Sequence, residues 1–237
     1  MPDLRTGSLG VSESLRKFVA EFPYERESIL AFVREAAKRI PAGARVADVG
    51  AGDAPFRELF AHAQYATLDW AESVHEGARA SDIVASADAI PVREGAFDAV
   101  IFTQVLEHVP EPTGVMSELY RILAKGGTLY LTAPLVWELH ELPHDYYRYT
   151  SEGLRHMLES AGFSSIEIEP RNDCFTTLAQ LMLNARWAMG SAPDGLDERR
   201  GAARELLTEL AGQLAALAPL DAERVLPLGY SAIGVRA

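Results

Sequence analysis

The chain has 237 residues, which is enough for one large α/β domain or two small ones. Its hydrophobic content of 48% can form a substantial core. The chain has 34 Asp and Glu against 22 Lys and Arg, which gives a net charge of −12. This charge argues against a nucleic-acid partner, because nucleic-acid binding requires positive side chains that neutralise phosphates. A single cysteine excludes a disulfide and a cysteine zinc site, and neither a signal peptide nor a membrane-length apolar stretch is evident, so we expect a cytoplasmic protein without stable membrane insertion.

Two helices are predicted within residues 11–40, because apolar residues recur there at helical spacing. They are separated at Phe22-Pro23, and Pro41-Ala42-Gly43 ends the second one. We expect residues 1–40 to form a helical cap on the domain that follows.

From residue 44 onward, short β-branched runs alternate with helical patterns. Strands are predicted over 44–52 (with its turn), 64–69, 81–88, 96–104, 128–134, 163–170 and 229–237. Helices are predicted over 54–63, 113–124, 150–161, 173–189 and 198–217. Strands joined by helical crossovers form a parallel sheet covered on both faces, so we predict a single doubly wound α/β domain with a mostly parallel seven-stranded sheet. Its core covers 41–170, a helical insertion covers 171–225, and 226–237 holds the last strand.

The insertion has a leucine stripe on its second helix, at positions 206, 207, 210, 214 and 217. Such a stripe is typical of a core or of a pocket wall. A dimer seam and a lipid contact are the alternatives, and acidic flanks disfavour the lipid contact. The chain is accordingly expected to be a monomer or a homodimer.

The first strand ends in the run Asp48-Val49-Gly50-Ala51-Gly52-Asp53-Ala54-Pro55. Two glycines let a backbone turn tightly and let a ligand approach closely. A dinucleotide site would need a third glycine where Pro55 stands. Asp48 and Asp53 would repel a pyrophosphate but not a ligand that carries a positive charge, so a nicotinamide cofactor fits this turn poorly.

Acids also follow the next two predicted strands. Asp69 closes the second strand at a distance from Gly52 that suits a carboxylate accepting hydrogen bonds from ribose hydroxyls. Asp88 ends the third strand and could accept from an exocyclic amine such as that of adenine. An aspartate beside a glycine turn is often only a turn residue, which is how we interpret Asp53 alone. Together, acids at successive strand ends indicate a cofactor site.

These motifs, in this order, resemble those of the class I S-adenosylmethionine-dependent methyltransferases. "VADVGAGDAPF" is similar to their first motif, "LDW" to their ribose-binding acid, and "ADAIPVREGAFDAVIFTQVLEHVPEP" and "ELYRILAKGGTLYLTAP" to their segments around strands four and five. The resemblance covers about residues 40–170. It implies S-adenosyl-L-methionine as the cofactor, a final strand antiparallel to its neighbours, and cofactor contacts at Asp48, Gly50, Ala51, Gly52, Asp69, Trp70, Asp88, Ala89, Thr103 and Gln104.

A second group of polar residues lies in "HELPHDYYRYT", residues 140–150. "HELPH" matches the zinc-protease pattern H-E-x-x-H, which needs both histidines on one face of a helix. Pro143 breaks such a helix, so we expect a lid over the substrate and no catalytic zinc. No acidic cluster requires magnesium, although the resemblance leaves a magnesium site open.

Methyl transfer to a hydroxyl or ammonium group also requires a base, since the acceptor must lose a proton. The candidates are His144, with Asp145 as its orienting partner, and His108; a capping or packing role is the alternative for His108. His140, Tyr146, Tyr147 and Arg148 are the candidates for substrate binding. We expect Tyr149 to be structural, because it precedes the helix cap.

The predicted function is therefore methyl transfer to a small molecule, for example a sugar or another metabolite of natural product biosynthesis. A nicotinamide-dependent oxidoreductase and a non-catalytic S-adenosylmethionine-binding protein are the alternatives.

Overall fold

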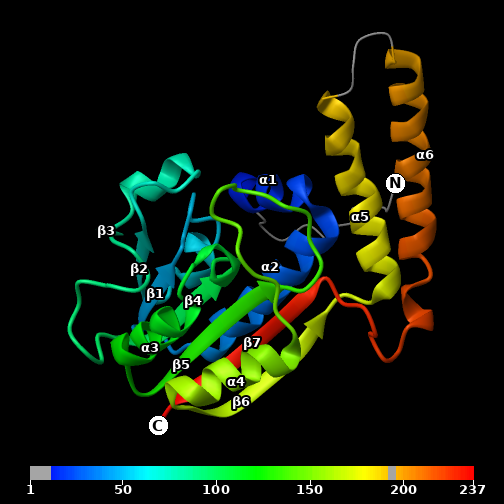
Figure 1. Ribbon diagram of the computed structural model, residues 1–237. Helices are drawn as coiled ribbons and strands as arrows, with labels where there is room; N and C mark the ends of the chain where they lie inside the picture. Colours follow the sequence, from blue (N-terminus) through cyan, green and yellow to red (C-terminus); the bar gives the residue numbers. More distant parts are fainter. Residues whose placement is uncertain (1–11, 192–195) are drawn as a thin grey trace.

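The computed structural model describes residues 12–191 and 196–237, and Figure 1 shows a sheet that crosses the molecule with helices on both faces. The strand order is β3-β2-β1-β4-β5-β7-β6. The strands are β1 (Arg45–Val49), β2 (Gln64–Asp69), β3 (Ile83–Val84), β4 (Phe97–Thr103), β5 (Leu123–Pro134), β6 (Phe163–Arg171) and β7 (Gly229–Arg236). The first five strands are parallel, and β7 is antiparallel to both β5 and β6. The predicted doubly wound, mostly parallel sheet with an antiparallel last strand is confirmed.

The structure has six α-helices in its described part, and four of them cover the two faces of the sheet in pairs. They are α1 (Glu13–Glu21), α2 (Pro23–Arg39), α3 (Pro112–Ile122), α4 (Ser151–Ala161), α5 (Cys174–Ala188) and α6 (Asp197–Ala215), with short 3-10 turns η1 (Arg57–Phe60), η2 (Glu76–Ala80), η3 (Leu106–His108), η4 (Met189–Ser191) and η5 (Ala218–Leu220). One hydrophobic core lies between the sheet and α3 and α4, and the other between the sheet and α1 and α2. Both faces are thus removed from water, as an open parallel sheet requires.

Local signals set the ends of several helices. Pro23 occupies the first turn of α2, where the missing backbone donor costs nothing. The Thr150 hydroxyl accepts a hydrogen bond from the Gly153 amide (3.1 Å) at the start of α4, and Gly162 ends that helix with φ +98°. The predicted boundaries of α2 and α4 are confirmed.

Two predicted elements are much shorter in the structure. The helix predicted over 54–63 is reduced to η1, because Ala54 adopts a left-handed φ of +50° and Pro55 follows it. The strand predicted over 81–88 is reduced to β3, an edge strand that pairs only with β2.

The insertion forms a pair of neighbouring helices, α5 and α6, which stand beyond the sheet edge (Figure 1). The buried face of α5 is polar: Gln180 Oε1 accepts from the Tyr24 amide (3.0 Å), and Asn184 Nδ2 donates to Glu138 Oε2 (2.7 Å). In the predicted leucine stripe, Leu206 is 56%, Leu210 37% and Leu217 40% exposed, so these three residues do not form core. In the described part of the chain, no helix has both the length and the apolar character of a membrane span.

The carboxyl of Asp48 is buried within the sheet rather than at its edge. Asp48 is 1% exposed and accepts a hydrogen bond from the Tyr65 hydroxyl of the neighbouring strand. Burial is the main cause that raises the pKa of Asp48, to about 7, although the Tyr65 hydrogen bond acts in the opposite direction. Because Asp48 shares a sheet face with Val46, its side chain points into the α1–α2 core.

We predict that Asp48→Asn makes folding stability less dependent on pH. In the unfolded chain an aspartate ionises near pH 4, whereas the folded carboxyl stays protonated up to about 7. The unfolded state therefore binds fewer protons in this window, and the free energy of unfolding falls as pH rises from 4 to 7. Between pH 5 and pH 7, Asp48 should lower the free energy of unfolding of the wild type by about 2–3 kcal/mol. Urea denaturation at the two pH values should show that this loss is missing in Asp48→Asn.

Asp98→Asn is the matched control for this measurement. A hydrogen bond from Arg45 lowers the pKa of Asp98, so this carboxylate is ionised in both the folded and the unfolded state above pH 5. Its variant should keep the wild-type pH slope. A wild-type slope in Asp48→Asn as well would show that Asp48 is ionised in the folded protein.

Candidate functional site

The glycine turn after β1 lies at the carboxyl ends of the parallel strands, where an open α/β sheet has its binding crevice. Gly50 and Gly52 have φ values of +74° and +53°. A Cβ atom at position 50 would lie 2.2 Å from the Val105 side chain, so only glycine fits there. The turn packs against Val105 and lies at the switch point of the sheet, where ligands of such folds bind. Ala51, between the glycines, is buried.

Asp69 faces this turn from the end of β2. Its carboxylate accepts hydrogen bonds from the Gly52 amide (2.7 Å) and the Trp70 amide (2.8 Å) and is 6% exposed. Each oxygen keeps a second lone pair, so the same carboxylate can accept from two hydroxyls of a ribose. The glycine turn and Asp69 therefore fit the ribose and the amino-acid part of S-adenosylmethionine. Asp88 and Ala89 follow β3 and are exposed, open to a ring placed above them.

Two acids near the turn have other partners. Asp48 contacts Tyr65 inside the core, as described above, so its predicted contact with the cofactor is not one that the described structure provides. Asp53 is exposed, and its Oδ1 accepts from the Gly77 amide at 2.9 Å, which is the turn role expected for it.

Thr103 and Gln104 lie at the end of β4, beside the crevice. Gln104 has φ +54°, a left-handed value that turns the chain sharply after the strand. In the orientation that satisfies its amide, Gln104 donates to Glu25 Oε1 (3.3 Å) and accepts from Thr132 (2.9 Å) and Arg171 (3.2 Å). Arg171 and Glu25 also form a buried ion pair at 2.9 Å. This polar cluster fixes the floor of the site.

Residues 135–150, here called the lid, are held against η3 by backbone hydrogen bonds. The Tyr146 and Tyr147 amides donate to the Glu107 carbonyl (2.9 and 3.3 Å), and the buried Tyr149 hydroxyl donates to the Leu106 carbonyl (2.9 Å). The side chains of Tyr146 and Tyr147 are 44% and 41% exposed on the outer surface. The lid is therefore fixed to η3 through its backbone and through Tyr149, the residue that we expected to be structural.

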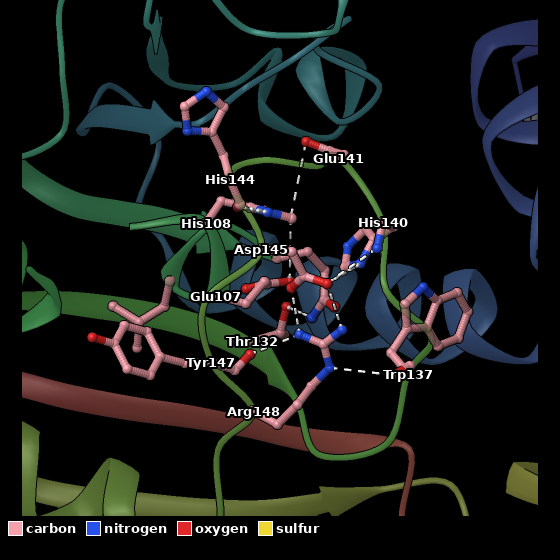
Figure 2. A network of polar contacts seen from close by, with 12 residues as sticks. Glu107, His108, Thr132, Trp137, His140, Glu141, His144, Asp145, Tyr147 and Arg148 are labelled. Carbon is pink, nitrogen blue, oxygen red and sulfur yellow. Dashed lines mark hydrogen bonds and ion pairs between the residues drawn. The ribbon is translucent and has the colours of Figure 1, made fainter. Parts of the chain in front are cut away.

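An ion pair braces the lid from within, as Figure 2 shows. Arg148 donates to both carboxylate oxygens of Asp145 (2.6 and 3.0 Å), and the His140 amide donates to Asp145 Oδ2 (3.0 Å). Burial acts to raise the pKa of Asp145, but the hydrogen bonds from Arg148 and His140 outweigh it and lower the pKa to about 2. We expected Asp145 to orient His144, and we expected Arg148 to bind substrate. In the structure, Asp145 and Arg148 instead pair with each other.

The two candidate bases lie on opposite sides of the lid backbone. The ring of His144 packs edge-on against Trp70, with centroids 5.1 Å apart, and so lies next to the residue that follows Asp69. His108 Nδ1 is 2.7 Å from the His144 carbonyl oxygen, and its side chain is 14% exposed. Burial lowers the pKa of His108, although Glu141 acts in the opposite direction. Burial thus favours the neutral imidazole of His108.

Residues 140–144 form a turn rather than a helix, as Pro143 led us to expect, so "HELPH" does not adopt the zinc-protease arrangement. The ring of His140 instead packs against that of His108, with centroids 4.7 Å apart.

Glu107 is a residue that sequence reasoning left out of the candidate site. It is 0% exposed, and burial raises its pKa to about 8. Neither carboxylate oxygen accepts a hydrogen bond from any described residue. Its position beside His108, directly after β4, was the available signal. A separate cavity of about 980 Å³, lined by Tyr24, Arg186 and residues of α6, has none of the predicted site residues in its wall.

The sequence was compared with known families and proteins. The family model described as "Methyltransferase domain" matches residues 22–168. The ubiquinone biosynthesis O-methyltransferase of Xanthomonas oryzae pv. oryzae (strain PXO99A) is 36% identical over 103 residues, covering 38% of this chain and 43% of the relative. Its counterpart in Xanthomonas campestris pv. campestris (strain B100) is 34% identical over 102 residues, again covering 38% and 43%. The chain thus matches less than half the length of these relatives.

Solved structures share the fold at low sequence identity. A methyltransferase from Archaeoglobus fulgidus, described as S-adenosylmethionine-dependent, superposes with a TM-score of 0.59 at 19% identity, over 93% of this chain and 98% of the other. The [4+2]-cyclase SpnF superposes with a TM-score of 0.58 at 19% identity, over 90% and 82%. A cyclase among these neighbours shows that the fold alone does not determine the reaction.

The family match extends from α2 to β6 and includes the glycine turn, Asp69 and the lid. Together with the strand order, it shows that the chain belongs to the methyltransferase-domain family, within the class I S-adenosylmethionine-dependent methyltransferases.

Proposed function

We propose that this protein transfers a methyl group from S-adenosyl-L-methionine to a hydroxyl group of a small molecule. The observation that carries the proposal is the crevice in which Asp69 accepts hydrogen bonds from the glycine turn beneath a lid. Family membership supports methyl transfer, and the names of the Xanthomonas relatives favour oxygen over nitrogen as the acceptor. The acceptor that we propose is a small molecule of natural product biosynthesis. We propose that the reaction takes place in the cytoplasm and that the enzyme is a monomer or a homodimer.

Each part of the site has a role in this reaction. The cofactor supplies an activated methyl group on a sulfonium, and that carbon bonds to the acceptor oxygen while the electron pair of the broken carbon–sulfur bond stays on sulfur. The chain itself must align the acceptor and exclude water, which the lid does by covering the crevice. The Gly50–Gly52 turn and Asp69 hold the donor, and Trp70, Thr103, Gln104, Asp88 and Ala89 complete its surroundings.

The proton of the acceptor hydroxyl needs a base, for which we propose His144. Its ring is partly exposed and lies against Trp70, at the cofactor side of the lid. His108 is the second candidate. His140, Tyr146 and Tyr147 are the nearby groups for substrate contacts, whereas Arg148 and Asp145 act by holding the lid in shape.

We predict that Asp69→Ala weakens binding of S-adenosylhomocysteine by about 1–3 kcal/mol, because hydrogen bonds to a charged group are lost. Isothermal titration calorimetry measures this directly. Asp53→Ala is the matched control: it removes a carboxylate from the same turn, but one that contacts Gly77, and it should leave affinity unchanged. Equal losses in the two variants would mean that the turn, not the ribose contact, is affected. Tighter binding of NAD than of S-adenosylhomocysteine would refute the cofactor assignment.

We predict that His144→Ala lowers the turnover of hydroxyl acceptors by about 10²–10⁴-fold, the contribution of general-base catalysis, with cofactor affinity nearly unchanged. A panel of phenols, sugars and amines, assayed by release of S-adenosylhomocysteine, supplies the acceptor. If His144→Ala keeps full turnover and His108→Ala loses it, His108 is the base. If the panel acceptor that is methylated is an amine and both variants are fully active with it, the amine reacts already deprotonated and neither histidine is a base. If no acceptor in the panel is methylated although the cofactor binds, the non-catalytic alternative gains support.

A further inference from the structure

Two segments far apart in the sequence bring three potential metal ligands together. Glu107 and His108 belong to η3, and His140 belongs to the lid. One ligand atom from each of these residues lies within 4.8 Å of the other two. Figure 2 shows Glu107, His108 and His140 gathered beside the Asp145–Arg148 ion pair. Two histidines and one carboxylate are the donor set of several catalytic metal sites.

The carboxylate of Glu107 has no partner that would offset its burial. Its side chain is 1% exposed, and neither oxygen accepts a hydrogen bond from any residue in the described ranges. Burying an ionised group without a partner costs several kcal/mol. Even a neutral polar group without a partner costs about 1–3 kcal/mol. A buried acid without a hydrogen-bond partner, beside two imidazoles, therefore points to a bound cation.

The two imidazoles are already oriented by hydrogen bonds at one nitrogen. His108 donates from Nδ1 to the His144 carbonyl (2.7 Å), which leaves Nε2 free, 4.0 Å from Glu107 Oε1. His140 Nδ1 lies 3.2 Å from the Glu138 carbonyl and 3.5 Å from Asp145 Oδ2. Metal-binding histidines almost always donate their other ring N–H to a carbonyl or carboxylate in this way.

We propose that Glu107, His108 and His140 bind one divalent transition-metal ion, with Zn²⁺ as the best fit. Zinc takes two histidines and one glutamate as protein ligands and keeps an open position, whereas magnesium prefers oxygen ligands. Ligand atoms about 2.0–2.2 Å from one metal lie closer together than the 4.8 Å limit within which these three lie, so a bound ion would draw the three side chains inward. Glu141 Oε2 lies 3.9 Å from His108 Nε2, on the exposed side of the site.

This site differs from the one that "HELPH" suggests and from the sequence-based expectation of no metal. It uses the first histidine of that pattern but not the second, since His144 is turned toward Trp70. The ion would join the lid to the end of β4. A role for the ion in catalysis rests on the proposed function: the open position of the ion would take the acceptor oxygen and lower the pKa of the acceptor hydroxyl.

The test is metal binding to the whole chain without methyl donor or acceptor, so that its outcome is independent of the proposed function. The protein is stripped with a chelator, dialysed, and titrated with ZnCl₂ and CoCl₂, by calorimetry and by the visible absorption of Co²⁺. We expect one ion per chain, a rise in Tm with Zn²⁺, and a loss of affinity of at least about 10–100-fold in His140→Ala and Glu107→Gln.

His144→Ala is the matched control, because it removes a lid histidine but leaves the backbone carbonyl that orients His108; it should bind Zn²⁺ as the wild type does. His140 lies in the lid, outside both hydrophobic cores, so His140→Ala keeps the test valid if Glu107→Gln does not fold. Wild-type protein that binds neither ion, or His140→Ala that binds with wild-type affinity, would overturn the proposal.

Discussion

The ion pair between Asp145 and Arg148 is the interaction on which the shape of the site depends. The lid has no helix or strand of its own, so ordering it costs backbone entropy that no regular hydrogen-bond ladder offsets. Arg148 meets the carboxylate in a two-point contact and also donates to the Glu138 carbonyl (2.8 Å). The Asp145 carboxylate is buried, and the pair connects Glu138 and His140 at the start of the lid to Arg148 near its end. The positions of His140 and His144 follow from it.

The lid is also supported from the side by the helical insertion. Asn184 of α5 donates to Glu138 of the lid, and Gln180 connects Asn184 to the backbone of α2. These amides are buried and satisfied, which makes their arrangement specific, because a buried amide without a partner is costly. The first helix of the insertion is therefore a support for the lid. It carries polar residues on its buried face for that reason.

The sequence predicted the sheet well and the site only in part, for different physical reasons. Strands and helices are local patterns, so the apolar spacing of α2 and the cap at Thr150 could be recognised within a few residues. Polar pairing is not local: Glu25 and Arg171 are 146 residues apart and leave no pattern. Asp145 was assigned to His144 because they are adjacent, yet neighbouring residues of an extended chain point in opposite directions. Its partners are Arg148 and the backbone of His140. The unpartnered state of Glu107 likewise exists only in the folded chain.

The place of β7 in the sheet has a consequence for how the protein is made. β7 lies between β5 and β6 and forms the only ladder that connects β6 to the rest of the described sheet. During synthesis β6 leaves the ribosome before α5, α6 and β7, so it waits as an unpaired edge until residues 229–236 have emerged. The five parallel strands can pair earlier, because their partners are complete by Pro134. Assembly of this protein is thus divided in time: one side of the sheet can form early on the nascent chain, and the other depends on β7, which is translated after β6, α5 and α6.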